Sequence, residues 1–142
     1  MGVRQAIKGK RVYFDTNVFI YLVEGYAAFE TSLNDIRDSI FHQEVDIFTC
    51  ELTLCEVLVV PFRSNNTELE NIYRQFIQDS GAFNVLPTKL ETYIRGSLFR
   101  AQMGLKMADA IHTATAVECG CEVFVSNDTG LKVPKGMALV GL

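Results

Sequence analysis

The sequence predicts one α/β domain, in which a mostly parallel sheet of about five strands lies between two layers of helices. Short, β-prone apolar segments alternate with longer segments of helical periodicity, which is typical of parallel sheets with helical crossovers. The chain has 142 residues, 49% of them hydrophobic and 21% charged, which suits one globular domain with a real core. We therefore expect residues 1–142 to form a single domain.

Five segments have the length and composition of strands. The first, residues 11–14, ends at Asp15, Thr16 and Asn17, and a helix is predicted to start at Asn17. A short apolar run, a polar cap and then a helix is how a βα unit begins. The other predicted strands cover residues 45–49, 83–86, 122–125 and 137–140.

Helical periodicity covers most of the remaining chain. Pro61 is predicted to stop one helix, because proline lacks the amide proton that a helix interior needs. Gly104 is predicted to break another helix, and Gly120 to form a C-terminal cap. The predicted helices after the first cover residues 27–43, 51–60, 66–80, 88–103 and 106–119.

Composition excludes several classes of protein. No apolar run approaches the roughly 20 residues that a membrane-spanning helix needs. The basic start, residues 1–10, is not followed by the apolar segment of a secretory signal. We therefore expect a cytoplasmic protein with no membrane partner.

The four cysteines do not have the spacing of a zinc site. Cys50 and Cys55 flank the start of a helix, and Cys119 and Cys121 form a C-x-C pair, whereas zinc sites favour matched C-x₂₋₄-C pairs. We therefore interpret the four cysteines as free thiols that are mostly buried.

Four acidic residues fall near one edge of the predicted sheet. Open parallel sheets bind ligands beyond the carboxyl ends of their strands. Asp15 follows the first strand directly, Glu56 lies on the helix after the second, and Asp128 lies three residues past Val125. Asp109 lies near the start of the helix that leads into the fourth strand. We expect the four carboxylates to lie together.

Glu56 is the most informative of the four. Its helical neighbours at i−4, i+3 and i+4 are Leu52, Val59 and Val60, so its carboxylate would lie on an apolar stripe. An ionised carboxylate there is unfavourable unless a partner such as a divalent cation compensates. The alternatives are a half-exposed glutamate or an ion pair with a basic residue such as Arg95.

The other three acids also have ordinary structural explanations. Asp109 could be an acid in the first turn of a helix, where the helix dipole favours it. Asp15 could be a helix cap and Asp128 a turn residue. Each signal is weak by itself, and their agreement on one edge of the sheet is what favours a metal site.

The net charge of −4 is unusual for a protein that binds nucleic acid. Without the four candidate ligands the chain has 13 acidic and 13 basic residues. Arg95, Arg100 and Lys106 are candidate contacts to RNA, although a solvated helix face explains them better. His112, three residues after Asp109, could lie behind the metal ligands, but such a histidine more often packs in the core, and we leave it out of the predicted site.

Each of the four acids lies in a short motif. The motifs are Asp15-Thr16-Asn17 after an apolar strand, Thr53-Leu54-Cys55-Glu56, Met107-Ala108-Asp109-Ala110-Ile111-His112-Thr113-Ala114-Thr115-Ala116 and Val125-Ser126-Asn127-Asp128. The third and fourth motifs, with their short separation, are the most specific. With these motifs the chain resembles the PIN domain family of nucleases, and within it the small VapC-type toxins.

The resemblance implies a Mg²⁺- or Mn²⁺-dependent endoribonuclease that leaves 5′-phosphate and 3′-hydroxyl ends. It also implies a homodimer and a cognate antitoxin that covers the site. The chain departs from the family in two respects. Its net charge is not positive, and residues 61–81 have no sequence pattern that assigns them to a known subgroup. The family's acidic positions correspond to Asp15, Glu56, Asp109 and Asp128, and its supporting polar positions to Thr16, Asn17, Thr53 and Ser126.

Oxygen ligands without a matched set of Cys and His favour Mg²⁺ or Mn²⁺ over zinc. Our hypothesis is that Asp15 and Asp109 hold the principal ion, and that Glu56 and Asp128 complete its shell directly or through water.

Two alternative functions stay open. A haloacid dehalogenase-like phosphatase needs a second aspartate where Asn17 stands, and an inactive binding module would act through protein contacts alone.

Overall fold

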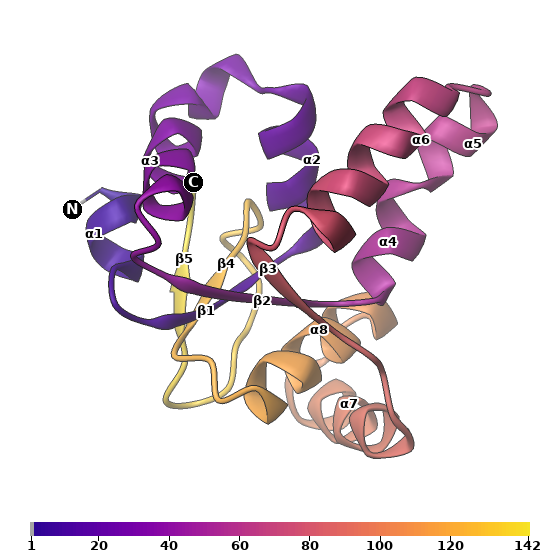
Figure 1. Ribbon diagram of the computed structural model, residues 1–142. Helices are drawn as coiled ribbons and strands as arrows, with labels where there is room; N and C mark the ends of the chain where they lie inside the picture. The colour runs from indigo at the N-terminus through magenta and orange to yellow at the C-terminus, as the bar shows by residue number, and fades with distance from the viewer. Residues whose placement is uncertain (1) are drawn as a thin grey trace.

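A five-stranded parallel sheet forms the centre of the computed structural model, which describes residues 2–142 (Figure 1). The strand order is β3-β2-β1-β4-β5, and every neighbouring pair is parallel. The strands are β1 (Arg11–Phe14), β2 (Asp46–Cys50), β3 (Phe83–Leu86), β4 (Val123–Val125) and β5 (Ala138–Val140). The predicted α/β class and parallel sheet are confirmed.

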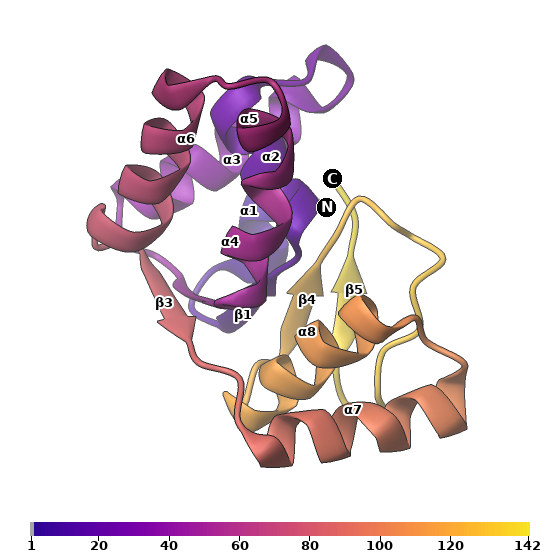
Figure 2. The ribbon, with the colours of Figure 1, turned by 90° about the vertical axis from the view of Figure 1, so that its right-hand side faces the viewer.

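Helices cover both faces of the sheet, as Figures 1 and 2 show. One face is covered by α7 (Leu90–Met103) and α8 (Met107–Glu118). The helices on the other side are α1 (Val3–Ile7), α2 (Thr16–Glu24), η1 (Ala27–Phe29), α3 (Glu30–Phe41), α4 (Leu52–Val57), α5 (Val59–Arg63), α6 (Thr67–Arg74) and the π-helical turn η2 (Gln75–Asp79). Of these, α5 packs against α4 and α6 at the outer end of this layer (Figure 1). The longest helix, α7, has 14 residues, and none within residues 2–142 could span a membrane.

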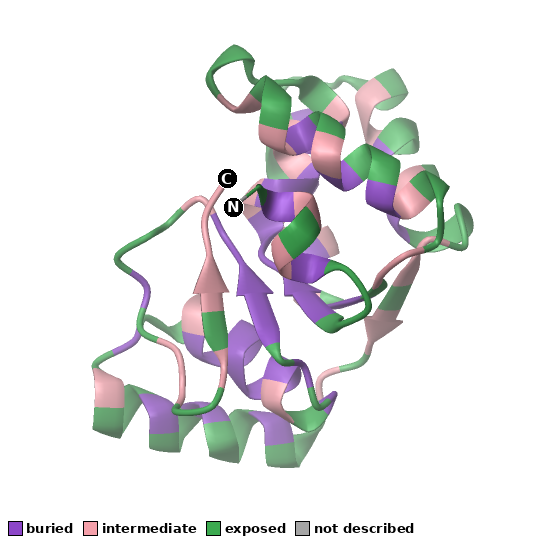
Figure 3. Ribbon diagram, turned by 90° about the vertical axis from the view of Figure 1, so that its left-hand side faces the viewer, coloured by how far each residue is buried: buried purple, intermediate pink, exposed green. Residues whose placement is uncertain are grey.

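Two apolar cores follow from the alternation of side chains along the strands. In β1, Val12 and Phe14 pack with the α1–α6 side, whereas Tyr13 between them packs with α7 and α8. Figure 3 shows β1 and β4 as buried, while the edge strands β3 and β5 are partly exposed. The central strands therefore have near-continuous apolar sequences, as sheets covered on both faces do.

Three local features differ from the sequence prediction. Pro61 was predicted to stop a helix, but it lies inside α5, which begins after a break at Leu58. Proline is tolerated there because the first amides of a helix have no intrahelical acceptor. The helix α1 was not predicted, and the predicted helix over residues 66–80 ends at Arg74 and continues as η2.

The strand order places a topological switch point between β1 and β4. The chain passes from β1 outward to β3, then returns to β4 on the other side of β1. Ligand sites in open α/β sheets lie at such a point, beyond the carboxyl ends of the strands. Asp15 follows β1 and Ser126 follows β4, so both lie at this point.

Candidate active site

Asp15 is buried at the switch point and is held by side chains from two strand ends. Its Oδ1 accepts a hydrogen bond from the backbone N–H of Thr16 at 2.8 Å, which caps α2. Its Oδ2 accepts from the Ser126 hydroxyl at 2.7 Å and from the Asn17 amide at 3.4 Å. The Asn17 carbonyl oxygen in turn accepts from the Asn127 N–H at 3.1 Å. These contacts fix the carboxylate and join the ends of β1 and β4.

Glu56 lies on α4 and is bound by groups from α2 and α8. Its Oε1 accepts from the Thr16 hydroxyl at 2.7 Å and from Nε2 of His112 at 2.6 Å. Burial by itself would raise the pKa of Glu56, but these two hydrogen bonds outweigh it and lower the pKa. Glu56 is therefore a carboxylate at neutral pH, although it lies on a largely apolar helix.

Asp109 is half-buried in the first turn of α8, and its charge is disfavoured. Burial raises the pKa of the Asp109 carboxyl, and the carboxylates of Asp15 and Asp128 raise it further. Asp128 is exposed in the loop after β4, where its N–H donates to the Ser126 hydroxyl at 3.0 Å. The four predicted acids therefore lie on one edge of the sheet and influence one another electrostatically.

The edge carries an excess of negative charge. Within residues 2–142, no Lys or Arg forms a salt bridge with Asp15, Glu56, Asp109 or Asp128, and His112 is the one basic partner. The alternative pairing of Glu56 with Arg95 is wrong, because Arg95 pairs with Glu118 at the opposite end of α8 from Asp109. A bound cation would supply the counter-charge that the described side chains do not.

The arrangement fits a hydrated divalent cation better than a closed metal cage. Within the described chain, no three Asp, Glu, His or Cys side chains form a ready-made metal-binding group. Mg²⁺ usually keeps several waters and binds through one or two carboxylates, so it does not need such a cage. Thr113, one helical turn after Asp109, has a buried hydroxyl with no hydrogen-bond partner in residues 2–142. The oxygen-rich edge therefore suits Mg²⁺ or Mn²⁺.

The sequence model of the PIN domain matches residues 12–136, which is most of the chain and includes all four acids. The chain belongs to the PIN domain family. Members of this family are generally nucleases. A comparison with curated proteins finds no match.

Solved structures share the fold of this PIN domain at low sequence identity. VapBC2 from Rickettsia felis, bound to a promoter DNA fragment, has a TM-score of 0.72 at 12% identity and covers 92% of this chain and 98% of its own. A toxin-antitoxin complex from Klebsiella pneumoniae has a TM-score of 0.65 at 22% identity, with coverage of 91% and 95%. VapC20 from Mycobacterium tuberculosis, a toxin that cleaves the sarcin-ricin loop, has a TM-score of 0.61 at 13% identity, with coverage of 80% and 86%.

Of the four supporting polar residues predicted for the site, three contact its carboxylates and one contacts the sheet. Thr16, Asn17 and Ser126 each hydrogen-bond a site carboxylate. Thr53 bonds instead to Thr49 at 2.7 Å, and the Thr49 hydroxyl donates to the carbonyl of Phe14 at 3.2 Å. Thr53 therefore anchors the start of α4 to the sheet and does not contact the acids.

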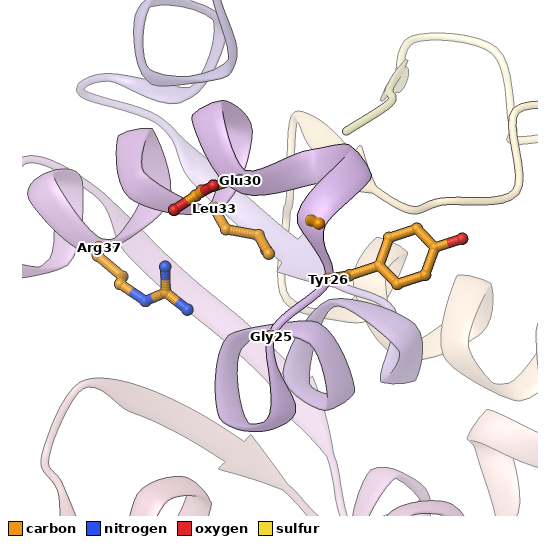
Figure 4. Close-up of a pocket in the computed structure, with 6 residues that line it drawn as sticks. Gly25, Tyr26, Glu30, Leu33 and Arg37 are labelled. Atoms are coloured by element: carbon orange, nitrogen blue, oxygen red, sulfur yellow. The ribbon is translucent and has the colours of Figure 1, made fainter.

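Two cavities lie outside the acidic edge. One of about 640 Å³ lies between the end of α2 and α3, and Figure 4 shows Gly25, Tyr26, Leu33 and Arg37 around it. Another, of about 560 Å³, has a mostly apolar lining that includes Leu52, Tyr93, Met107 and Ile111, from α4, α7 and α8. The four carboxylates line neither cavity, so the candidate site is an open edge and not a deep pocket.

Sequence analysis left His112 out of the site, because a histidine at this position more often packs in the core than supports a ligand. The side chain is buried, but both ring nitrogens face polar groups from other elements. Its position three residues after Asp109 places it on the same helix face, which was the available signal. Its other partners, Tyr13 and Glu56, are 99 and 56 residues away in the chain, so spacing could not reveal them.

Proposed function

We propose that this PIN domain is a Mg²⁺- or Mn²⁺-dependent endoribonuclease that hydrolyses RNA phosphodiester bonds. The observation that carries the proposal is the set of four carboxylates at the switch point without a Lys or Arg counter-charge within residues 2–142. Such a set would repel a phosphate group unless a divalent cation were bound. Family membership supports the same chemistry.

Each acid has a proposed role. Asp15 and Asp109 would hold the principal ion, because Asp15 is fixed by Ser126 and Asn17 and because Asp109 carries an unfavourable charge. Glu56 and Asp128 would complete the shell directly or through water. When bound, the ion would supply a water of lowered pKa as nucleophile and offset charge on the phosphate oxygens. The chain's own contribution is to fix the carboxylates and to place them beside the exposed edge.

We also propose that the protein is the toxin of a toxin-antitoxin pair, acts in the cytoplasm as a homodimer, and is inhibited by a cognate antitoxin. The structural neighbours include VapBC2 and a toxin-antitoxin complex. VapC20 cleaves the sarcin-ricin loop, which supports RNA as the substrate class.

One assay tests the nuclease proposal against both alternatives. The protein is incubated with mixed RNA and, separately, with a generic phosphomonoester, in Mg²⁺, Mn²⁺ or EDTA. We expect internal RNA cuts that need the metal, and a loss of about a hundredfold or more in rate for Asp15→Asn, since metal catalysis is worth several kcal/mol. The matched control Asp79→Asn, at an exposed aspartate of η2, should keep the parent rate.

Each alternative predicts a different result. Phosphate release from the monoester without RNA cleavage would support a haloacid dehalogenase-like phosphatase. No turnover of either substrate would support a binding module. Cleavage that persists in EDTA, or in Asp15→Asn, would contradict the proposed site.

A further inference from the structure

We propose that His112 is a positioning residue, which holds one oxygen of Glu56 so that the other oxygen is presented to the bound cation. The inference rests on the proposed metal-dependent function and adds a residue to it. His112 is 1% exposed, so it does not contact RNA itself.

His112 links three elements through its two ring nitrogens. Nε2 lies 2.6 Å from Oε1 of Glu56 on α4 and 3.1 Å from the Thr16 hydroxyl on α2. Nδ1 lies 2.6 Å from the Tyr13 hydroxyl on β1 and 3.6 Å from the Cys50 thiol. A buried ring with partners on both sides has one orientation available, because turning it would leave polar groups unpaired.

The contact with Glu56 does not depend on the charge of the ring. Nε2–H donates to Oε1 of Glu56 in either protonation state. In the neutral ring the Tyr13 hydroxyl donates to Nδ1, and in the protonated ring it accepts from Nδ1. Tyr13 therefore holds the ring in place for Glu56 in both states.

The two oxygens of Glu56 have different surroundings. Oε1 accepts from both Thr16 and His112, at 2.7 and 2.6 Å. Oε2 has no hydrogen-bond donor among the residues that the structure describes, and the side chain is 33% exposed. The carboxylate is therefore fixed through one oxygen while the other is free to bind a ligand, as in metal sites whose ligands are oriented by hydrogen bonds behind them.

The secondary structure explains why Glu56 needs this anchor. The helix that carries it, α4, has six residues and ends at the break at Leu58, so few backbone hydrogen bonds hold it in place. His112 belongs to the longer helix α8, three residues after Asp109. The bond from His112 to Glu56 therefore fixes the position of one site acid relative to the helix that carries another.

The test compares His112→Leu, which removes both ring contacts, with His112→Gln, whose amide N–H can reach the same oxygen. His42→Leu is the matched control, because His42 is exposed at the end of α3, where its ring bonds to the Asp38 carbonyl and packs against Phe41. Mn²⁺ affinity is measured by titration calorimetry on the full chain. The cleavage rate is measured as a function of Mn²⁺ concentration, and thermal unfolding is followed in EDTA.

We expect His112→Leu to weaken Mn²⁺ binding by about 10- to 100-fold, as the loss of a group that orients a metal ligand does. The Mn²⁺ concentration for half-maximal cleavage should rise by the same factor, with a smaller change in kcat at saturating Mn²⁺. His112→Gln should restore most of the affinity, and His42→Leu should match the parent. A purely structural role would lower the unfolding midpoint without this shift in Mn²⁺ requirement.

If His112→Leu shows no cooperative unfolding, Tyr13→Phe carries the test. It removes the hydroxyl behind Nδ1 and leaves both His112 and Glu56, so Mn²⁺ affinity should fall in the same direction. If His112→Leu folds and binds Mn²⁺ as tightly as the parent, the inference about His112 is wrong, while the proposed nuclease function stands. If His112→Leu does not fold, unchanged Mn²⁺ affinity in Tyr13→Phe has the same meaning. A parent protein that binds no Mn²⁺ overturns the proposed function, and the inference with it.

Discussion

At the scale of single residues, Asp109 has surroundings that disfavour its charge. Its pKa is raised by burial and by neighbouring carboxylates, so the folded state binds the Asp109 proton more tightly than the unfolded state does. Stability therefore falls as the pH rises from the ordinary value of 3.8 through the raised pKa, and the unfavourable contribution is fully present at pH 7. The metal-free site is under electrostatic strain that a cation would relieve.

The first prediction at this scale is that Asp109→Asn stabilises the metal-free protein while abolishing RNA cleavage. In EDTA at pH 7, the unfolding midpoint should rise by about 2 °C or more, because the amide carries no charge in either state. The difference from the parent should shrink as the pH falls below 3.8, where Asp109 is protonated in both states. Differential scanning calorimetry at several pH values measures the unfolding midpoints of the variant and the parent. A variant that is less stable than the parent at pH 7 would contradict the prediction.

Sequence reasoning selected the four acids because each has a local signal. Asp15 and Asp128 follow apolar strands, and Glu56 interrupts a predicted apolar helix stripe. The structure divides that stripe, because α4 ends at Val57 and the next valines, Val59 and Val60, are exposed on α5. His112 gave only a weak signal, its position three residues after Asp109, and a histidine in an apolar helix more often packs in the core. Its function comes from contacts with residues distant in the chain, and a single sequence does not contain those distances.

At the scale of elements, the sequence predicted all five strands and most helices, but not which face of α7 is buried. Apolar Leu90, Ile94 and Leu98 have the i, i+4, i+8 spacing of a core stripe, yet they are 71%, 61% and 51% exposed. The small residues Thr92 and Gly96 are buried against α8 instead. Periodicity marks an apolar face but does not say what covers it.

The close approach of α7 and α8 at Gly96 gives an element-scale prediction. A Cβ at Gly96 would lie 3.1 Å from Cδ1 of Ile111 and 3.6 Å from the carbonyl oxygen of Ala110. Gly96→Val should therefore destabilise the protein by about 1–3 kcal/mol through overpacking. Ser97→Val, at the exposed next position, should change stability by about 0.5 kcal/mol or less. Urea unfolding measures both, and equal stabilities for the two variants would show that the helices can separate without penalty.

At the scale of the whole molecule, exposed apolar side chains are concentrated on two helices. Several of the large exposed apolar side chains lie on α5 and α7, in particular Val60, Phe62, Ile94 and Leu98. An extended exposed apolar surface indicates contact with another protein. We expect the proposed homodimer to use the apolar stripe of Leu90, Ile94 and Leu98 on α7.

The last prediction is therefore that the stripe on α7 holds the dimer together. The parent should sediment as a dimer, and Ile94→Glu combined with Leu98→Glu should sediment as a monomer, because two charges would be buried without partners in the contact. The matched control adds glutamates at the same spacing on exposed α6 and η2 positions, as Asn71→Glu with Gln75→Glu, and should stay dimeric. Because the substituted side chains are exposed in one chain, the monomer should keep the parent's circular dichroism spectrum. A parent that sediments as a monomer at tens of micromolar, or a dimer that survives both glutamates on α7, would rule out this face as the contact.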